Sequence, residues 1–327
     1  RGGGPPPPPP PAPAPAPRKG RAHAASARPA PEPPARSGLL ELHRARFVRW
    51  SPKAVVALAA GGGPSGGWVA VGRECGGVEV LRADEDWCRL ASLAGWEGAA
   101  LTSLAWSGPR RESLVSAGLD GRLRLWDLRA GSPRSVEDAH GGGVWALAAA
   151  PPPPEGSSYD GGGDEYDHLV AAACDDGAAR LFAVEGGLAV SYRRSLPRVE
   201  GRVLCVAWHP SGGALVAGGS DGCVRVWGGV RGAAPPRELL RVTSGGPKRE
   251  LGVWAVACLG DGTLVSGDSD GRVCFWDGSS GGALLTAKRH AADVLALAAT
   301  PDGSCVFASG VDAQVALFQR VEVAAGG

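Results

Sequence analysis

From about residue 43 the chain alternates apolar and polar positions in short runs that are separated by turns. Four runs share one pattern: an apolar strand ending in small residues, an Asp-Gly turn, and an alternating strand ending in an aromatic residue. They read LVSAGLDGRLRLWDL (114–128), LVAAACDDGAARLFAV (169–184), LVAGGSDGCVRVWGG (215–229) and LVSGDSDGRVCFWDG (264–278). Because Asp-Gly readily adopts the positive φ angles of a two-residue turn, each run predicts a β-hairpin.

Two degenerate copies extend this repeat, WVAVGRECGGVEVLRA (68–83) and VFASGVDAQVALFQRV (306–321). The turn positions are spaced by 45, 56, 45, 49 and 42 residues when these are taken as equivalent: Gly76, Gly121, Gly177, Gly222, Gly271 and Ala313. A further apolar run precedes most copies, at 101–106, 144–149, 203–212, 253–262 and 294–303. One such sheet cannot bury both of its faces, whereas sheets stacked around an axis can.

The repeats therefore predict an all-β fold, a β-propeller with six recognisable blades. A seventh blade would have to come from sequence beyond Gly327 or from strands that the pattern does not reveal. The stretch from 54 to 72, which six Gly and Pro residues interrupt, predicts two strands around a turn rather than a membrane-spanning helix.

Composition divides the chain into an arm at 1–40 and a propeller at 41–327. Residues 1–38 hold 14 of the 28 prolines, so we expect a disordered Pro/Ala/Arg-rich arm that builds no core. The arm is basic, which fits either a nuclear-import or nucleic-acid tail or a solvated leader. The sequence has no methionine, and we expect it to be a fragment or an incomplete gene model.

Charge and cysteine content exclude several classes of function. The formal net charge is +1, so the whole chain offers no electrostatic argument for binding nucleic acid or a membrane. Five cysteines lie in apolar β-like runs, and the chain has no C-x-x-C pair; these are Cys205, Cys223, Cys258, Cys274 and Cys305. We interpret them as buried small hydrophobic residues and expect neither a metal nor a cofactor.

The repeats resemble the WD40 family in the pairs Trp126-Asp127 and Trp276-Asp277, in His140 and His290, and in the Asp-Gly turns. In that family a histidine, a Ser or Thr, the turn Asp and the Trp form a buried hydrogen-bonded chain. Here no blade shows the complete set. The sixth has His290, Ser309 and Asp312 but Phe318 in place of Trp, and the third has Ala172 or Ala173 near the hydroxyl position and Phe182 in place of Trp. The resemblance therefore implies blades that depend more on apolar packing than on the polar chain.

Several segments resemble one branch of that family, the cirhin-like proteins. They are HRARFVRWSP (43–52), VEDAHGGGVWALAAAP (136–151), RVLCVAWHPSGGALVAGGSDG (202–222) and GPKRELGVWAVACLGDGTLVSGDSDGRVCFWDGSSGGAL (246–284). The resemblance covers nearly all of 43–320. It implies a nucleolar, non-catalytic scaffold of the UtpA subcomplex in the small-subunit processome, supporting 18S precursor processing and rRNA transcription. The partners implied are other UtpA proteins and pre-ribosomal RNA, with no membrane and no small-molecule substrate.

No sequence motif supports an enzyme. The phosphate-binding, dinucleotide-binding, metalloprotease and nucleophile-elbow motifs are all absent from the sequence. Five aspartates recur at equivalent turns, and we interpret them as caps of their own hairpins rather than as an acid–base cluster: Asp120, Asp176, Asp221, Asp270 and Asp312.

Basic residues between the predicted strands are the candidate binding sites. They are Arg44, Arg46, Arg49 and Lys53 before the first blade, Arg193, Arg194, Arg198 and Arg202 between the third and fourth, and Lys248 and Arg249 before the fifth. Outside the strands such charges can meet phosphates or acidic partner segments, although ordinary solvated loop charge explains each cluster as well.

Two alternative functions remain open. Residues 114–129 resemble the box of WD40 substrate receptors of cullin-RING ubiquitin ligases, in which Trp126, Asp127 and the terminal Arg129 would meet the ligase adaptor. The other alternative is a generic WD40 interaction scaffold elsewhere in the cell.

Overall fold

The computed structural model describes residues 53–63, 65–83, 87–95, 100–108, 110–151, 168–231, 237–243 and 251–320. All of them belong to the unit Val48–Gly327. The predicted arm at 1–40 lies outside the described residues. The described part is all β, which confirms the predicted fold class, and its strands form six antiparallel sheets that we call blades 1 to 6 in chain order.

Each of the first five blades has four strands. Blade 1 holds β1 (Val55–Gly62), β2 (Trp68–Arg73), β3 (Val78–Arg82) and β4 (Cys88–Leu93); blade 2 holds β5 (Leu101–Ser107), β6 (Ser113–Gly118), β7 (Arg122–Asp127) and β8 (Ser132–Asp138). Blade 3 holds β9 (Val144–Ala149), β10 (Leu169–Cys174), β11 (Ala179–Glu185) and β12 (Ala189–Ser195); blade 4 holds β13 (Val203–Trp208), β14 (Ala214–Gly219), β15 (Cys223–Gly228) and β16 (Arg237–Thr243).

Blade 5 holds β17 (Val253–Cys258), β18 (Leu264–Asp268), β19 (Arg272–Trp276) and β20 (Ala283–Lys288). Blade 6 has three strands among the described residues, β21 (Val294–Ala299), β22 (Cys305–Gly310) and β23 (Val315–Gln319). The predicted pair of strands in 54–72 is confirmed as β1 and β2, and every predicted Asp-Gly hairpin is present.

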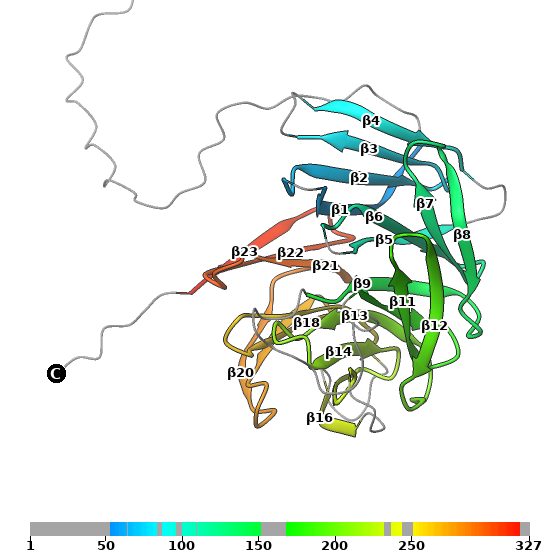
Figure 1. Cartoon of the computed structure of the whole chain (residues 1–327). Helices are drawn as coiled ribbons and strands as arrows, with labels where there is room; N and C mark the ends of the chain where they lie inside the picture. The colour runs from blue at the N-terminus through cyan, green and yellow to red at the C-terminus, as the bar shows by residue number, and fades with distance from the viewer. Residues whose placement is uncertain are drawn as a thin grey trace, which may run out of the picture. The chain divides into compact units, whose positions relative to one another are not determined.

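Successive blades pack face to face, with the first strand of each blade beside the first strand of the next (Figure 1). Between blades 2 and 3, for example, Val115 and Leu125 pack against Val170 and Phe182 in one fully buried cluster. Similar clusters fill the contacts between the other successive blades. Burial of these apolar faces, which no single sheet could achieve, is the main force holding the blades together.

The tight turns explain why glycine recurs at them. Gly222 has a φ of +75°, and a Cβ atom there would lie 2.6 Å from the carbonyl oxygen of Leu251 in the next blade. Ala313 takes the equivalent place in blade 6 with a φ of +57°, which places a non-glycine residue in the left-handed region.

Candidate interaction surfaces

The predicted turn aspartates bind groups of their own blades. Asp120, Asp176, Asp221 and Asp312 each accept a hydrogen bond from the backbone N–H two residues later. Blade 5 differs because Asp268 accepts the turn N–H groups, while Asp270 binds Arg272 and Lys288. The five carboxylates therefore lie in separate hairpins.

Three buried arginines complete these hairpins and were missed from the sequence. Arg124, Arg180 and Arg225 are each 3–5% exposed and pair with the turn Asp four residues earlier. In blade 3 both carboxylate oxygens of Asp176 accept hydrogen bonds from Arg180, at 2.8 and 2.6 Å. These bonds lower the pKa of Asp176. The signal was present in the sequence, since D-G-x-x-R recurs in three consecutive blades.

Different blades hold different parts of the hydrogen-bonded chain expected from the family. Trp126 donates to Ser116 at 2.8 Å in blade 2, and Trp276 donates to Ser266 at 3.0 Å in blade 5. In blade 4 the equivalent position is Ala217, and the buried Nε1 of Trp227 has no hydrogen-bond partner among the described residues.

The strand register of blade 6 shows that one residue of the expected polar chain, Ser309, was assigned wrongly. The Nδ1 atom of the fully buried His290 lies 3.0 Å from Asp312, so these two groups meet as the family pattern implies. However, Ser309 is not at the hydroxyl position. Ala308 takes that place, because Ala308 pairs with Ala316 as Ser266 pairs with Cys274. The assignment of Ser309 was wrong by one residue, which in a strand puts the side chain on the opposite face.

A β-bulge at the start of every first strand re-aims one side chain per blade. At the start of each first strand the register with the second strand skips one residue, and the six residues skipped there are Val56, Thr102, Trp145, Leu204, Trp254 and Leu295. Bulges of this kind redirect side chains at sheet ends and beside binding sites.

The bulge residues of blades 3 and 5 meet. The rings of Trp145 and Trp254 are 6.2 Å apart and edge to face. Arg202 lies over Trp145 at 5.8 Å and pairs with Asp175 at 2.8 Å. Asp175 also accepts a hydrogen bond from the Trp145 indole. The bulges therefore build a half-buried aromatic cluster at the end of the blades that carries the Asp-Gly turns.

The predicted basic clusters are only partly within the described residues. Arg44, Arg46, Arg49, Lys248 and Arg249 lie outside them, while Lys53 is exposed.

The cluster between blades 3 and 4 differs from its prediction. Arg193 and Arg194 were expected outside the strands but lie within β12, because the fourth strand of blade 3 extends to Ser195. Arg193 pairs with Glu185 at 2.8 Å, and Arg198 pairs with Asp176. Much of this cluster's charge is therefore compensated by nearby carboxylates.

The proposed ligase box contains one exposed arginine. Trp126 is 4% exposed, so it belongs to the blade interior. Asp127 accepts hydrogen bonds from the Arg134 side chain and from the backbone N–H groups of Ala130 and Arg129, and these hold its pKa at about 2. Arg129 itself is exposed.

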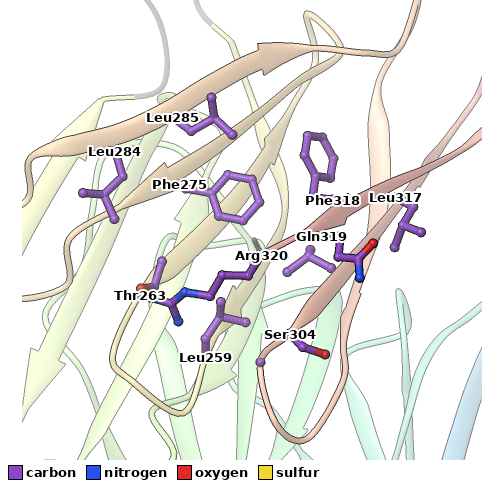
Figure 2. Close-up of a pocket in the computed structure, with 12 residues that line it drawn as sticks. Leu259, Thr263, Phe275, Leu284, Leu285, Ser304, Leu317, Phe318, Gln319 and Arg320 are labelled. Atoms are coloured by element: carbon purple, nitrogen blue, oxygen red, sulfur yellow. The ribbon is translucent and has the colours of Figure 1, made fainter. Parts of the chain in front are cut away.

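An apolar cavity of about 420 Å³ lies between blades 5 and 6. Figure 2 shows Phe275, Leu284 and Leu285 of blade 5 on one side and Phe318 with Arg320 on the other. The two phenylalanine rings are 5.4 Å apart, and Arg320 pairs with Asp261 at 2.6 Å. The cavity adjoins the edge of β23, where blade 6 has no fourth strand among the described residues.

The eight cysteines, all of them among the described residues, form no disulfide bond. Cys205, Cys223 and Cys274 are buried, and Cys258 and Cys305 are partly buried. Burial raises the pKa of Cys205 to about 12, so its thiol stays protonated at neutral pH. No cluster of potential metal ligands occurs in the described part of the chain. Among the same residues, no helix has the length and apolar character needed to span a membrane.

Comparison with known proteins agrees with the repeat pattern and the six sheets. The sequence model of the family described as WD domain, G-beta repeat matches residues 87–127, 193–228 and 238–277. Three segments of the chain thus match WD40 repeats.

Several known proteins align with most of the chain. U3 small nucleolar RNA-associated protein 4 of Schizosaccharomyces pombe is 31% identical over 290 residues, which is 86% of this chain and 39% of that protein. The Saccharomyces cerevisiae protein of the same name is 28% identical over 292 residues, 85% of this chain and 36% of that protein. The Homo sapiens homolog is 30% identical over 226 residues, 69% of this chain and 30% of that protein. The chain thus spans well under half the length of these relatives.

Proposed function

We propose that this WD40 chain is a non-catalytic scaffold of ribosome biogenesis, acting in the small-subunit processome to support 18S precursor processing. The observation that carries the proposal is the similarity over 290 residues to a U3 small nucleolar RNA-associated protein. A propeller suits a scaffold because buried blade contacts fix the core while turns and edges vary. We place the protein in the nucleolus, with UtpA proteins as partners.

Direct contact with pre-ribosomal RNA or acidic partner segments is assigned to the connections that precede the first strands. Arg44, Arg46, Arg49 and Lys53 precede β1, and Lys248 and Arg249 precede β17. The strands that follow these residues in the sequence, β1 and β17, begin at the same end of their blades as the turns between second and third strands. Arg193 and Arg194 lie instead on the outer strand of blade 3, where a partner would approach from the side.

The test is affinity purification of the tagged protein from nuclear extract, in RNase-treated and untreated halves, with mass spectrometry and RNA sequencing. We expect other UtpA proteins together with precursor ribosomal RNA. Partner proteins that still copurify after RNase treatment would be bound through protein surfaces rather than through RNA. Absence of all processome proteins from both halves would refute the proposal.

Charge reversal of Arg44, Arg46 and Arg49 tests the first connection. RNA or partner recovery should fall without a change in Tm, because charges that the sequence predicts to lie outside the strands contribute little to stability. Reversal of Arg122, an exposed arginine at the start of β7, is the matched control and should leave recovery unchanged. Unchanged recovery in the triple variant would show that these three arginines do not bind RNA or partner proteins.

One observation favours the ligase-receptor alternative: Arg129 is exposed directly beside the ordered Asp127 turn. Under that alternative, Arg129→Ala would abolish recovery of a cullin and its adaptor. Under the scaffold proposal the same variant keeps its processome partners. Recovery of a cullin and adaptor without processome proteins would decide for the receptor.

A further inference from the structure

The bulge tryptophans of blades 3 and 5 are each held by a hydrogen bond to the turn of their own blade. Trp145 donates its indole N–H to Asp175 at 3.1 Å, and Trp254 donates to Ser269 at 3.1 Å. The Ser269 hydroxyl in turn donates to the carbonyl oxygen of Gly252 at 3.0 Å. Both indoles are therefore fixed at their polar edge, although each side chain is only partly buried.

Arg202 is fixed beside these rings through its backbone and its side chain. Its backbone N–H donates to the Ser220 hydroxyl at 2.8 Å, and its carbonyl oxygen accepts the Ser220 N–H at 2.9 Å. Its Nε atom lies 2.8 Å from Oδ1 of Asp175, the same oxygen that accepts the Trp145 indole. One carboxylate oxygen thus orients a guanidinium and a tryptophan together.

The outer end of Arg202 is available to a ligand. Its side chain is 56% exposed, and its two terminal nitrogens have no polar partner among the described residues. The planar fork of a guanidinium matches the two oxygens of a carboxylate or a phosphate. Because Asp175 and the Trp145 ring already restrict this side chain, less conformational entropy is lost when the fork binds an oxyanion.

Apolar surface lies next to this fork. The rings of Trp145 and Trp254 are in contact edge to face. Leu119, in the turn of blade 2, is 45% exposed, and its Cδ2 would be 3.2 Å from a Cβ atom on Gly143, two residues before Trp145. Exposed aromatic side chains beside an arginine are typical of the residues that dominate protein interfaces.

The charges around Arg202 favour a peptide over a nucleic acid. Asp175 pairs with Arg202, Glu200 is exposed two residues earlier, and the exposed Arg198 of the same connection pairs with Asp176. Single-stranded nucleic acids carry a charge on every nucleotide and bind in grooves lined with several cations. A segment with one carboxylate beside apolar side chains needs only one fork and one apolar surface.

We propose that Arg202, Trp145 and Trp254, which we call the Arg–Trp site, bind a segment of a partner protein in which Glu or Asp is next to Pro, Leu or an aromatic residue. The carboxylate accepts hydrogen bonds from the terminal nitrogens of Arg202, and the apolar neighbour packs against Trp254. The inference rests on the proposed function, because it names the kind of segment that the scaffold would hold.

Selection of peptides on the isolated chain tests the site. Random 12-residue peptides displayed on phage are selected on the immobilised full chain and counter-selected on the Arg202→Gln chain. We expect the selected peptides to be enriched in an acid next to Pro, Leu or an aromatic residue. Their Kd should rise about tenfold or more in Arg202→Gln. Replacing the peptide's acid by its amide should weaken binding to the unchanged chain, but have little further effect in Arg202→Gln.

Two further variants separate the site from its surroundings. Arg198→Gln is the matched control, because Arg198 is also exposed and paired with an aspartate, and the Kd should change less than about twofold. Trp254→Leu tests the apolar contact. Leucine occupies the equivalent bulge as Leu204 and Leu295, so we expect this variant to fold and its Kd to rise about fivefold or more. Equal Kd values in Arg202→Gln and Arg198→Gln, or an unchanged Kd in Trp254→Leu, would overturn the proposal.

A fluorescein-labelled 12-nucleotide single-stranded RNA of random sequence tests the other class of ligand. RNA that binds more tightly than the selected peptides and is lost in both Arg202→Gln and Trp254→Leu would assign the site to RNA and overturn the proposal. A selection that yields no peptide sensitive to Arg202→Gln would overturn it as well. Because these measurements use the chain alone, they are independent of the recovery of UtpA proteins from nuclear extract. Absence of processome proteins from that extract, with peptide binding intact, would refute only the proposed function.

Discussion

Blades 2 and 4 share the same strands and turn, yet they hold their tryptophans differently. The indole N–H of Trp126 donates to Ser116, whereas that of the equally buried Trp227 faces Ala217 and has no partner among the described residues. Both blades keep a buried Asp–Arg pair at the hairpin, Asp120 with Arg124 and Asp221 with Arg225. The difference indicates that the ion pair is the common polar element and the Trp–Ser bond an addition.

The largest effect is expected from removing the arginine of blade 4. Arg225→Met should lower the free energy of unfolding by about 2–4 kcal/mol, because Asp221 would keep its charge in a mostly buried site without its partner. Urea denaturation measures the change. Arg272→Met in blade 5 is the control, since this side chain is one-third exposed and should cost less than about 1 kcal/mol. Equal losses of unfolding free energy in the two variants would mean that the buried Asp221–Arg225 pair contributes no more than the more exposed Asp270–Arg272 pair.

Loss of the serine in blade 2 should make that blade resemble blade 4. Ser116→Ala leaves the buried Trp126 N–H without an acceptor and should cost about 1–3 kcal/mol. Ser132→Ala, on the exposed outer strand of the same blade, should change stability by less than about 0.5 kcal/mol. No measurable difference between these variants would show that the Trp–Ser bond contributes nothing.

The reverse change should improve blade 4. Ala217→Ser supplies an acceptor to Trp227 and should raise the free energy of unfolding by about 1 kcal/mol. In a Trp227→Phe background the same serine should give no gain, because the donor is gone. A gain that persists without the indole would attribute the effect to something other than this hydrogen bond.

The smallest effect concerns pH. Hydrogen bonds lower the pKa of Asp127 to about 2 and also lower that of Asp176, so both contribute stability that is fully present above the unfolded pKa near 4. That contribution is lost as the pH falls through the folded values. Denaturation between pH 5 and pH 2 should therefore show decreasing stability, with a shallower slope in Asp127→Asn. An unchanged slope would show that Asp127 does not contribute to the loss of stability at acid pH.

The repeat, the hairpins and the six blades could be predicted because they depend on local chemistry. An Asp-Gly turn between alternating runs specifies a hairpin, and recurrence at about 45 residues specifies stacked sheets. Ser309 was misplaced because the sequence alone did not fix the strand register to one residue. Arg193 was expected in a loop because residues 191–195, SYRRS, lack the apolar alternation of the inner strands, although Pro197 marks the end of β12.

The ion pairs of Arg198 and Arg202 could not be predicted. Arg198 and Arg202 lie 22 and 27 residues from the carboxylates of Asp176 and Asp175, and only the folded blade brings each pair together. The 55% exposure of Leu317 in β23 was equally hidden, since its run of residues is as apolar as its buried counterparts. Whether such a strand is covered depends on what packs against it.

The bulges at the start of the first strands separate side chains that fill the contacts between blades from side chains that the strand register skips. The six residues that the register skips lie outside the alternation that fills the contacts between blades, but they are not equally free. Thr102 donates to the backbone carbonyl of Val144 in the next blade, and Leu204 is 6% exposed. The chain carries valine, threonine, leucine and tryptophan at this one position. Protein engineers could therefore vary Val56 and Leu295, which are 42% and 50% exposed, on an unchanged scaffold.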